Sequence, residues 1–223
     1  VAIFGNGYNN SEADGAASAT GGAVLYIVGL ATGVLVNKID TGAGMAADPT
    51  GLGRANGLAT PAVADLDGDG IADLAYAGDL FGNLWKFDLS GAGPAAWDVA
   101  YHSGGVPVPL FRARGADGGV QPITERPQVG GHGPGQIGGV MVYFGTGKYF
   151  EVGDNVAAGQ TTQTFYGLWD KNDGAVPTFT RGDLVQQAIL HELAVGGHDV
   201  RVTSQVTVDW ATRYGWYLDL YNT

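Results

Sequence analysis

Short runs of apolar residues recur from one end of the chain to the other, and Gly, Asp or Asn bounds most of them. This pattern is typical of antiparallel β-strands that are joined by tight turns. The segment 184–194, LVQQAILHELA, fits either a short helix or a strand, because its periodicity does not separate the two. Elsewhere we expect strands at 1–4, 23–28, 34–39, 72–78, 82–90, 139–147, 163–170, 200–208 and 214–220.

Several of the expected strands resemble one another. In VLYIVGLATGVLV, NLWKFDLSG, TFYGLWDKNDG and GWYLDLYNT, an aromatic residue lies in an apolar strand that precedes Asp or Gly and a polar turn. The spacing is irregular, but several such units fit propeller blades of roughly 40–50 residues. Each blade would bury its apolar face against its neighbour. The pattern therefore favours an all-β, modified β-propeller of short antiparallel strands over the alternative, a β-sandwich.

Glycine is unusually frequent, at 39 of 223 residues, and shows no collagen-like period. These glycines indicate turns between many short elements. Two glycine-rich segments, 40–60 and 113–139, are expected to be long loops, which in a compact domain are usually functional or mobile. With 45% hydrophobic residues the chain can bury a core, and we expect one propeller domain over residues 1–223.

The net charge of −11 and the absence of cysteine exclude several classes of function. A negative field repels phosphate backbones and attracts cations, so we expect no nucleic-acid partner. A chain without cysteine has no disulfide, thiol catalyst or thiolate metal site. No apolar run approaches the roughly 20 residues of a membrane-spanning helix. No signal peptide is visible, so we expect either an intracellular chain or a piece of a longer secreted protein.

The most polar stretch is DLDGDGIAD, residues 65–73. Asp65, Asp67 and Asp69 occupy positions 1, 3 and 5 of a calcium-binding loop, and glycine occupies position 6, where such loops turn sharply. Ile71 would contribute its backbone carbonyl at position 7, and Asp73 stands at position 9. Calcium takes 6–8 oxygen ligands at about 2.3–2.6 Å, most of which this loop can supply.

Position 12 of this loop is Tyr76, where a helix-loop-helix site has a bidentate Glu. The flanking sequences TPAVA and LAYAG are strand-like, so we expect a calcium loop between two strands. The alternative is an Asp-Gly hairpin turn with solvated charges, and the regular spacing of the aspartates argues against it. Magnesium fits less well, because it demands octahedral geometry and retains water ligands.

A longer stretch around this loop, NGLATPAVADLDGDGIADLAYAGDLFGNLWKFDLSG (56–91), resembles the C-terminal propeller of the PilY1/PilC family of type IV pilus biogenesis factors and tip adhesins. The resemblance continues in the family's order through VAIFGNGYN and AVLYIVGLATGVLVNKIDTG upstream. Downstream it includes PLFRA, QPITERPQVG, MVYFGTGKYFE, QTFYGLWD, DLVQQ, RVTS and GWYLDL. It covers nearly the whole chain.

The resemblance implies an irregular β-propeller that is exported and associated with the pilus tip, the outer membrane or the cell surface. It implies a Ca²⁺ site in one blade that regulates pilus extension and retraction, with ligands at Asp65, Asp67, Asp69, Asp73 and the carbonyl of Ile71. Expected partners are the pilus machinery, including minor pilins, and host-surface receptors. The family's propeller is longer than this chain, so we also expect a fragment.

Three other features suggest chemistry that we do not favour. Arg181-Gly182-Asp183 is an Arg-Gly-Asp tripeptide, but so short a motif is common by chance and this one adjoins an apolar run. The histidines at 102, 132, 191 and 198 show no metal-binding spacing. Trp85, Trp169 and Trp216 could stack on sugars, but packing between blades is the better interpretation.

We therefore expect a calcium-responsive pilus and adhesion module that is not an enzyme. The first alternative is a quinoprotein-like propeller enzyme, because LYIVGLATG is similar to segments of those propellers. Such enzymes commonly carry a vicinal cysteine pair, which this chain lacks. The second alternative is a glycan-binding propeller in which calcium is a structural support.

Overall fold

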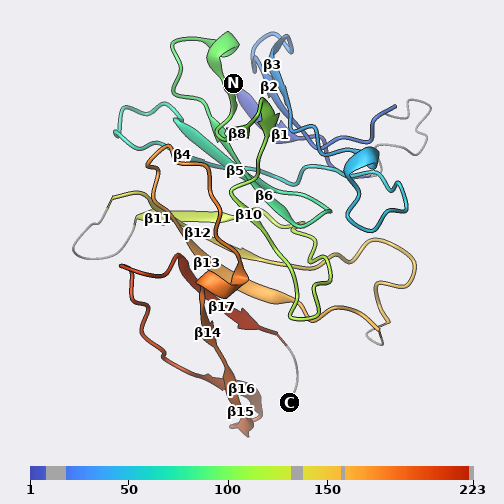
Figure 1. The fold of residues 1–223 in the computed structure, drawn as a ribbon, viewed down its shortest axis with the longest axis vertical. Coiled ribbons are helices and arrows are strands. Elements are labelled where there is room, and N and C mark those ends of the chain that lie inside the picture. Colours follow the sequence, from blue (N-terminus) through green and yellow to red (C-terminus); the bar gives the residue numbers. More distant parts are fainter. Residues whose placement is uncertain (9–18, 132–137, 157–158, 221–223) are drawn as a thin grey trace.

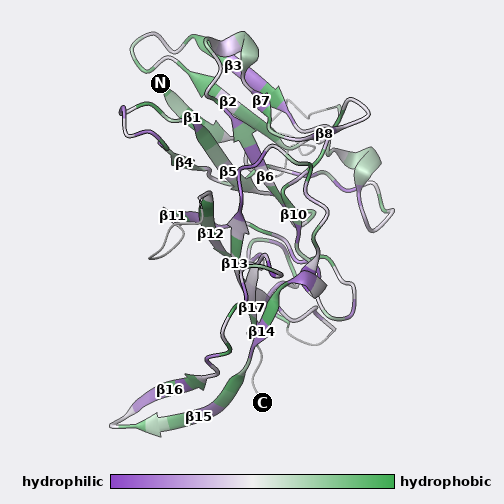
Figure 2. Cartoon of the chain, turned by 60° about the vertical axis from the view of Figure 1, so that its left-hand side comes forward, coloured by the Kyte–Doolittle hydropathy of each residue, from purple (hydrophilic) through white to green (hydrophobic). Residues whose placement is uncertain are grey.

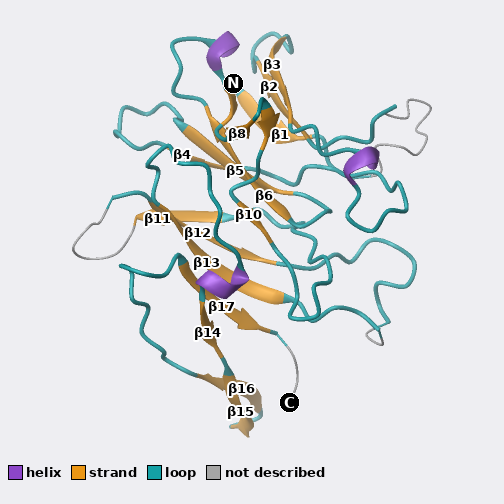
Figure 3. Cartoon of the chain, viewed as in Figure 1, coloured by secondary structure: helices purple, strands orange, loops and turns teal. Residues whose placement is uncertain are grey.

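The computed structural model describes residues 1–8, 19–131, 138–156 and 159–220, and these form an all-β structure (Figures 1 and 3). Helical turns in the described residues are confined to three short 3₁₀ segments: η1 (Met45–Ala47), η2 (Pro94–Ala96) and η3 (Arg181–Asp183). No helix within these residues is long and apolar enough to cross a membrane.

Three sheets contain most of the described strands. The first has the order β1-β2-β3 and consists of β1 (Ala2–Gly5), β2 (Val24–Val28) and β3 (Leu35–Asp40). The second has the order β10-β6-β5-β4, with β7 also paired to β6, and consists of β4 (Ala62–Ala64), β5 (Leu74–Gly78), β6 (Asn83–Asp88), β7 (Asp98–Val99) and β10 (Phe111–Arg112).

The third sheet has the order β11-β12-β13-β17-β14. It consists of β11 (Gln128–Gly131), β12 (Val140–Gly145), β13 (Thr164–Asp170), β14 (Val185–Gln187) and β17 (Gly215–Asp219). Two hairpins complete the described strands: β8 (His102–Ser103) with β9 (Val106–Pro107), and β15 (Ile189–Val195) with β16 (His198–Thr203). Figure 1 shows the sheets following one another along the molecule, and Figure 2 shows the β15–β16 hairpin extending away from them.

The middle sheet is buried on both faces, because each face packs against a neighbouring sheet. Leu74 and Tyr76 of β5 belong to a core shared with the third sheet, which includes Val142 and Tyr166. The alternating residues Ala75 and Ala77 belong to a second core, shared with the first sheet. A strand presents successive side chains to opposite faces, so β5 contributes to both cores. This is the blade-on-blade packing that the repeated aromatic strands predict.

The structure confirms most of the expected strands and corrects the rest. Segment 184–194 is strand, in β14 and β15, and the strand expected at 200–208 ends at Thr203. The expectation of a loop throughout 113–139 was wrong, because β11 lies within it and pairs with β12. The sequence pattern also missed β7 to β10, which are only two residues long and depend on pairing with other strands.

Candidate metal centre

The acidic segment 65–73 is the loop of a β-hairpin between β4 and β5. The register pairs Ala64 with Leu74, and the backbone N–H of Asp73 donates to the carbonyl of Ala64 at 2.9 Å. Both ends of the loop are therefore held by a strand ladder. The prediction of an acidic loop between two strands is confirmed.

Two glycines allow the backbone to reverse within the loop. Gly68 and Gly70 have φ values of +80° and +87°, which L side chains rarely adopt. Neither glycine has a neighbouring atom within 4 Å of an added Cβ, so backbone conformation and not space requires glycine here. The turn at Gly70 is the one that the calcium-loop spacing predicts.

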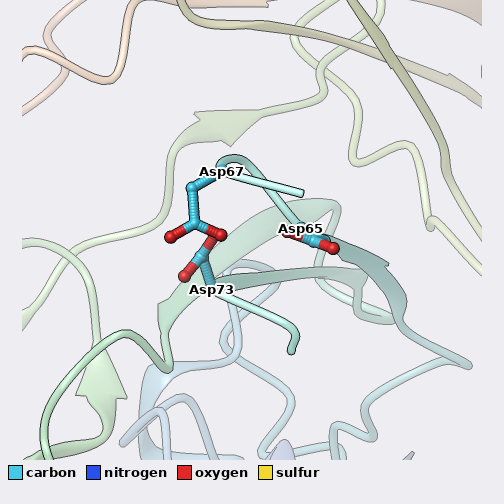
Figure 4. Close-up of side chains that lie close together, drawn as sticks. All are labelled: Asp65, Asp67 and Asp73. Carbon is cyan, nitrogen blue, oxygen red and sulfur yellow. The ribbon is translucent and has the colours of Figure 1, made fainter. Parts of the chain in front are cut away.

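Three aspartates converge at this turn. Asp65, Asp67 and Asp73 each offer a carboxylate oxygen, and these oxygens lie within 4.8 Å of one another (Figure 4). Asp65 and Asp67 are exposed and Asp73 is half-buried. In the part of the chain that the structure describes, this is the one group of three or more His, Cys, Asp or Glu side chains with metal-binding proximity.

Backbone N–H groups orient the three carboxylates. Asp65 accepts bonds from Gly68 at 2.7 Å on Oδ1 and from Gly70 at 2.8 Å on Oδ2. Asp67 Oδ1 accepts a bond from the N–H of residue 69 at 3.1 Å, and Asp73 Oδ2 accepts one from residue 66 at 2.7 Å. These bonds hold the side chains in place from the protein side, as is required of a preorganised ligand set.

Among the described residues, no side-chain cation balances the negative charge of the loop, because none of the loop's aspartates forms an ion pair there. The N–H groups of Gly70 and Gly68 lower the pKa of Asp65 by stabilising its charged form. Asp65 is therefore ionised at neutral pH beside two further carboxylates. Such a cluster attracts a hard cation with oxygen preference.

The two remaining predicted ligands are placed differently. Asp69 lies outside the group of three, and its Oδ1 accepts the backbone N–H of Ile71 at 2.7 Å. Ile71 is 66% exposed. Asp69 and the carbonyl of Ile71 therefore stay predicted ligands, whereas Asp65, Asp67 and Asp73 are brought together.

A cleft between the second and third sheets adjoins the loop, a feature that the sequence did not predict. It is lined by Ala64, Asp65 and Leu66 on one side and by β11 and the start of β12 on the other. The first residues of the acidic loop therefore border the next sheet. A change in the conformation of the loop would therefore alter the shape of this cleft.

The Arg-Gly-Asp tripeptide forms η3, and its two charged side chains bond within the chain. Arg181 pairs with Asp219 at 2.6 Å, and its guanidinium lies 3.8 Å from the ring centre of Tyr217. The carboxylate of Asp183 accepts the backbone N–H and the hydroxyl of Thr180. Both charges are thus engaged, which supports the interpretation that the tripeptide is structural.

The tryptophans predicted to pack between blades are mostly buried. Trp85 is 2% exposed and Trp169 is 5% exposed, so neither presents a face to a sugar. Trp216 is half-buried and lies across Gly167, where an added Cβ would come within 2.7 Å of the indole. Among the described histidines, 102, 191 and 198, none joins a metal-binding group, and His132 lies outside the described residues.

The family model of the PilY1 beta-propeller domain matches residues 1–195. The chain belongs to the PilY1 β-propeller family. The type IV pilus biogenesis factor PilY1 homolog of Xylella fastidiosa (strain Temecula1) is 42% identical over 224 residues, which cover 99% of this chain and 14% of that protein. The type IV pilus biogenesis factor PilY1 of Pseudomonas aeruginosa (strain PAO1) is 36% identical over 247 residues, which cover 97% of this chain and 20% of that protein.

The crystal structure of the Pseudomonas aeruginosa PilY1 C-terminal domain is similar to this chain, with a TM-score of 0.78 and 36% identity. The match covers 98% of this chain and 47% of that chain. Together with the family model, it confirms the predicted PilY1 resemblance and the all-β propeller fold. The chain spans about half of the crystallised PilY1 domain and a fifth or less of the two PilY1 relatives.

Proposed function

We propose that this chain is a calcium-binding propeller region of an exported type IV pilus biogenesis factor. Calcium occupancy of loop 65–73 regulates pilus extension and retraction and supports surface adhesion. The observation that carries the proposal is the convergence of Asp65, Asp67 and Asp73 within 4.8 Å in a chain of the PilY1 family.

The donor set fits calcium. All the available side-chain donors are carboxylate oxygens, which calcium prefers, and the chain has no thiolate to favour a softer metal. We assign Asp65, Asp67 and Asp73 as ligands on their proximity, and Asp69 and the Ile71 carbonyl on loop spacing. Asp69 uses Oδ1 for a backbone bond, which leaves Oδ2 for the ion.

The position of the loop suggests how occupancy reaches the rest of the molecule. Without calcium, backbone N–H bonds hold the three carboxylates near one another against their mutual repulsion, and binding of the ion draws them closer together. Since the loop begins beside the cleft to the third sheet, this movement alters the contact between two blades. Pilus machinery that contacts this region, including minor pilins at the tip, would then sense calcium.

The proposal also places the protein at the pilus tip, the outer membrane or the cell surface, where host receptors are accessible to it. Its curated relatives are named pilus biogenesis factors, and we propose that this domain does not catalyse a reaction. We also propose that the three sheets are blades of a longer propeller. No described contact favours the quinoprotein or the glycan-binding alternative over the proposed calcium-binding pilus function.

Pilus assays with the full-length protein test the regulatory role. We expect Asp65→Ala to change pilus number and twitching motility while protein abundance stays constant. Asp67→Lys should mimic calcium occupancy in part, because it places a fixed positive charge among the remaining carboxylates. The matched control is Asp88→Ala, which removes an exposed aspartate that caps a turn outside the cluster. Unchanged pili in Asp65→Ala cells would contradict the regulatory role.

A further inference from the structure

A buried polar cluster joins the second and third sheets at Lys86. This side chain lies on β6 and is only 3% exposed, and its Nζ is 2.7 Å from Oδ2 of Asp170 at the end of β13. Tyr76 donates to the same carboxylate at 2.6 Å and Tyr101 at 3.2 Å. The cluster thus places a buried amine beside a buried carboxylate.

Asn172 also belongs to the cluster. Its Oδ1 lies 2.6 Å from Nζ of Lys86, and its backbone N–H donates to Oδ1 of Asp170 at 3.0 Å. Among the described residues it is the one non-glycine residue with positive φ, at 50°. This sparsely populated conformation aims the side-chain amide at the lysine.

Amine, amide carbonyl and carboxylate therefore meet in the arrangement that amide exchange requires. The carbonyl carbon of Asn172 is one C=O bond beyond Oδ1, so it lies close to the distance of about 3–3.5 Å at which reacting atoms are poised. Asp170 contacts the nucleophile and is positioned to move its proton.

We propose that Lys86 and Asn172 form an intramolecular isopeptide bond, with Asp170 as the proton-transfer group. Asp170 takes a proton from the Lys86 ammonium, and the free lone pair attacks Cγ of Asn172. The C–Nζ bond forms as the carbonyl electron pair moves to Oδ1. Asp170 then passes its proton to Nδ2, the C–Nδ2 bond breaks and the carbonyl is restored. The departing ammonia takes the extra proton that Nζ still carries and leaves as an ammonium ion, with one hydrogen remaining on the new amide nitrogen.

The reaction balances without a co-reactant. The ammonium and the amide together hold five hydrogens, of which one stays on the new amide nitrogen and four leave as an ammonium ion. Asp170 ends as the carboxylate that it was at the start. Asn172 is exposed, so the leaving group departs directly into solvent.

The bond would connect β6 of the second sheet to the segment that follows β13 of the third. The two residues are 86 positions apart and meet only after these sheets have packed, so the reaction follows folding. The product is a covalent link between neighbouring blades. This inference rests on the cluster alone and is independent of the acidic loop.

Intact-mass spectrometry of the purified, denatured chain tests the bond. We expect a mass lower than that of the sequence by one ammonia, and a proteolytic product in which the peptides containing residues 86 and 172 are joined. The deficit should disappear in Lys86→Gln and persist in Lys171→Gln, the matched control at a neighbouring lysine. A wild-type chain with its full sequence mass would overturn the proposal.

Ammonia is also lost when an asparagine cyclises on its own backbone, and Lys86→Gln separates the two events. A deficit that survives in Lys86→Gln, with no joined peptide in the wild type, would overturn the cross-link. Asp170→Asn should keep the full sequence mass while retaining its β-rich circular dichroism spectrum. A cross-link formed undiminished in Asp170→Asn would refute the assigned proton transfer.

Discussion

Asp79 and the aspartates of the acidic loop differ in their burial and in their hydrogen-bond partners. Asp79 is fully buried, and its oxygens accept four N–H bonds, two from Asn83, one from Trp85 and one from Asn56. The aspartates of loop 65–73 are largely exposed and accept backbone N–H bonds from within the loop, while oxygens of three of them converge. A carboxylate with complete internal partners is structural, whereas converging oxygens without a cation suit an external ion.

The partners of Asp79 explain why a buried carboxylate is tolerated. Burial raises its pKa, and the N–H donors of Trp85, Asn83 and Asn56 oppose that rise. Asn56 belongs to the glycine-rich segment 40–60, so Asp79 ties this segment to the turn between β5 and β6. The segment, expected to be functional or mobile, is anchored here by a core contact.

The largest expected effect comes from breaking the buried site. Asp79→Ala should lower the free energy of unfolding by about 3–5 kcal/mol, because several buried N–H donors lose their acceptor. Urea denaturation followed by tryptophan fluorescence measures this loss. The control, Asp88→Ala, should change stability by about 0.5 kcal/mol or less. A loss below about 1 kcal/mol in Asp79→Ala would contradict the structural role.

Removing Arg181 should have the next largest effect. Arg181 and Asp219 are 14% and 12% exposed in their side chains, so Arg181→Ala leaves a mostly buried carboxylate unpaired. We expect a loss of about 3 kcal/mol, at the low end for buried pairs because some solvent reaches this one. Arg126→Ala, at an exposed arginine, is the control in the same denaturation assay. Equal stability of the two variants would show that the tripeptide's arginine is not structural.

Calcium should stabilise the protein through loop 65–73 and not through Asp79. At a hundredfold excess over its dissociation constant, calcium should stabilise the wild type by about 2.7 kcal/mol. Asp65→Ala should lose this gain, while its stability without calcium changes little, because its N–H partners are open to water. Thermal unfolding with calcium and with a chelator measures both values. A calcium gain retained by Asp65→Ala would break the contrast between the two sites.

The smallest expected effect is on the pH dependence of stability in the absence of calcium. The pKa of Asp65 is lowered in the folded chain, so its contribution is present above the unfolded value of about 4 and is lost as pH falls through the folded pKa. As the pH falls from neutral to below about 4, the free energy of unfolding should therefore decline less for Asp65→Ala than for wild type, and unfolding curves at several pH values measure this. Identical declines would mean that the N–H bonds to Asp65 do not stabilise its charge.

The acidic loop was predictable from the sequence because its geometry is local. Aspartates at alternate positions and a glycine at the sharp turn lie within nine residues, and apolar runs mark the strands on either side. The detailed role of Asp69 was not predictable, because its carboxylate can bind either the ion or the nearby N–H of Ile71.

The buried networks could not be read from the sequence, because their members are far apart along it. Tyr76 and Asp170 are separated by 94 positions and meet only when two sheets pack. Asp79 similarly reads as a turn residue, and its burial depends on Asn56 and Trp85 from two other segments. Local patterns thus predict strands and the loop, whereas contacts between sheets require the fold.

Titration calorimetry of the purified chain with calcium tests the central claim most directly. The wild type should bind one calcium ion with a dissociation constant in the micromolar range, within the roughly 10⁻⁷ to 10⁻³ M that calcium loops span. Asp65→Ala should show no binding heat, and Asp88→Ala should match the wild type. Equal calcium heats in wild type and Asp65→Ala would show that loop 65–73 is a charged turn and not a calcium site.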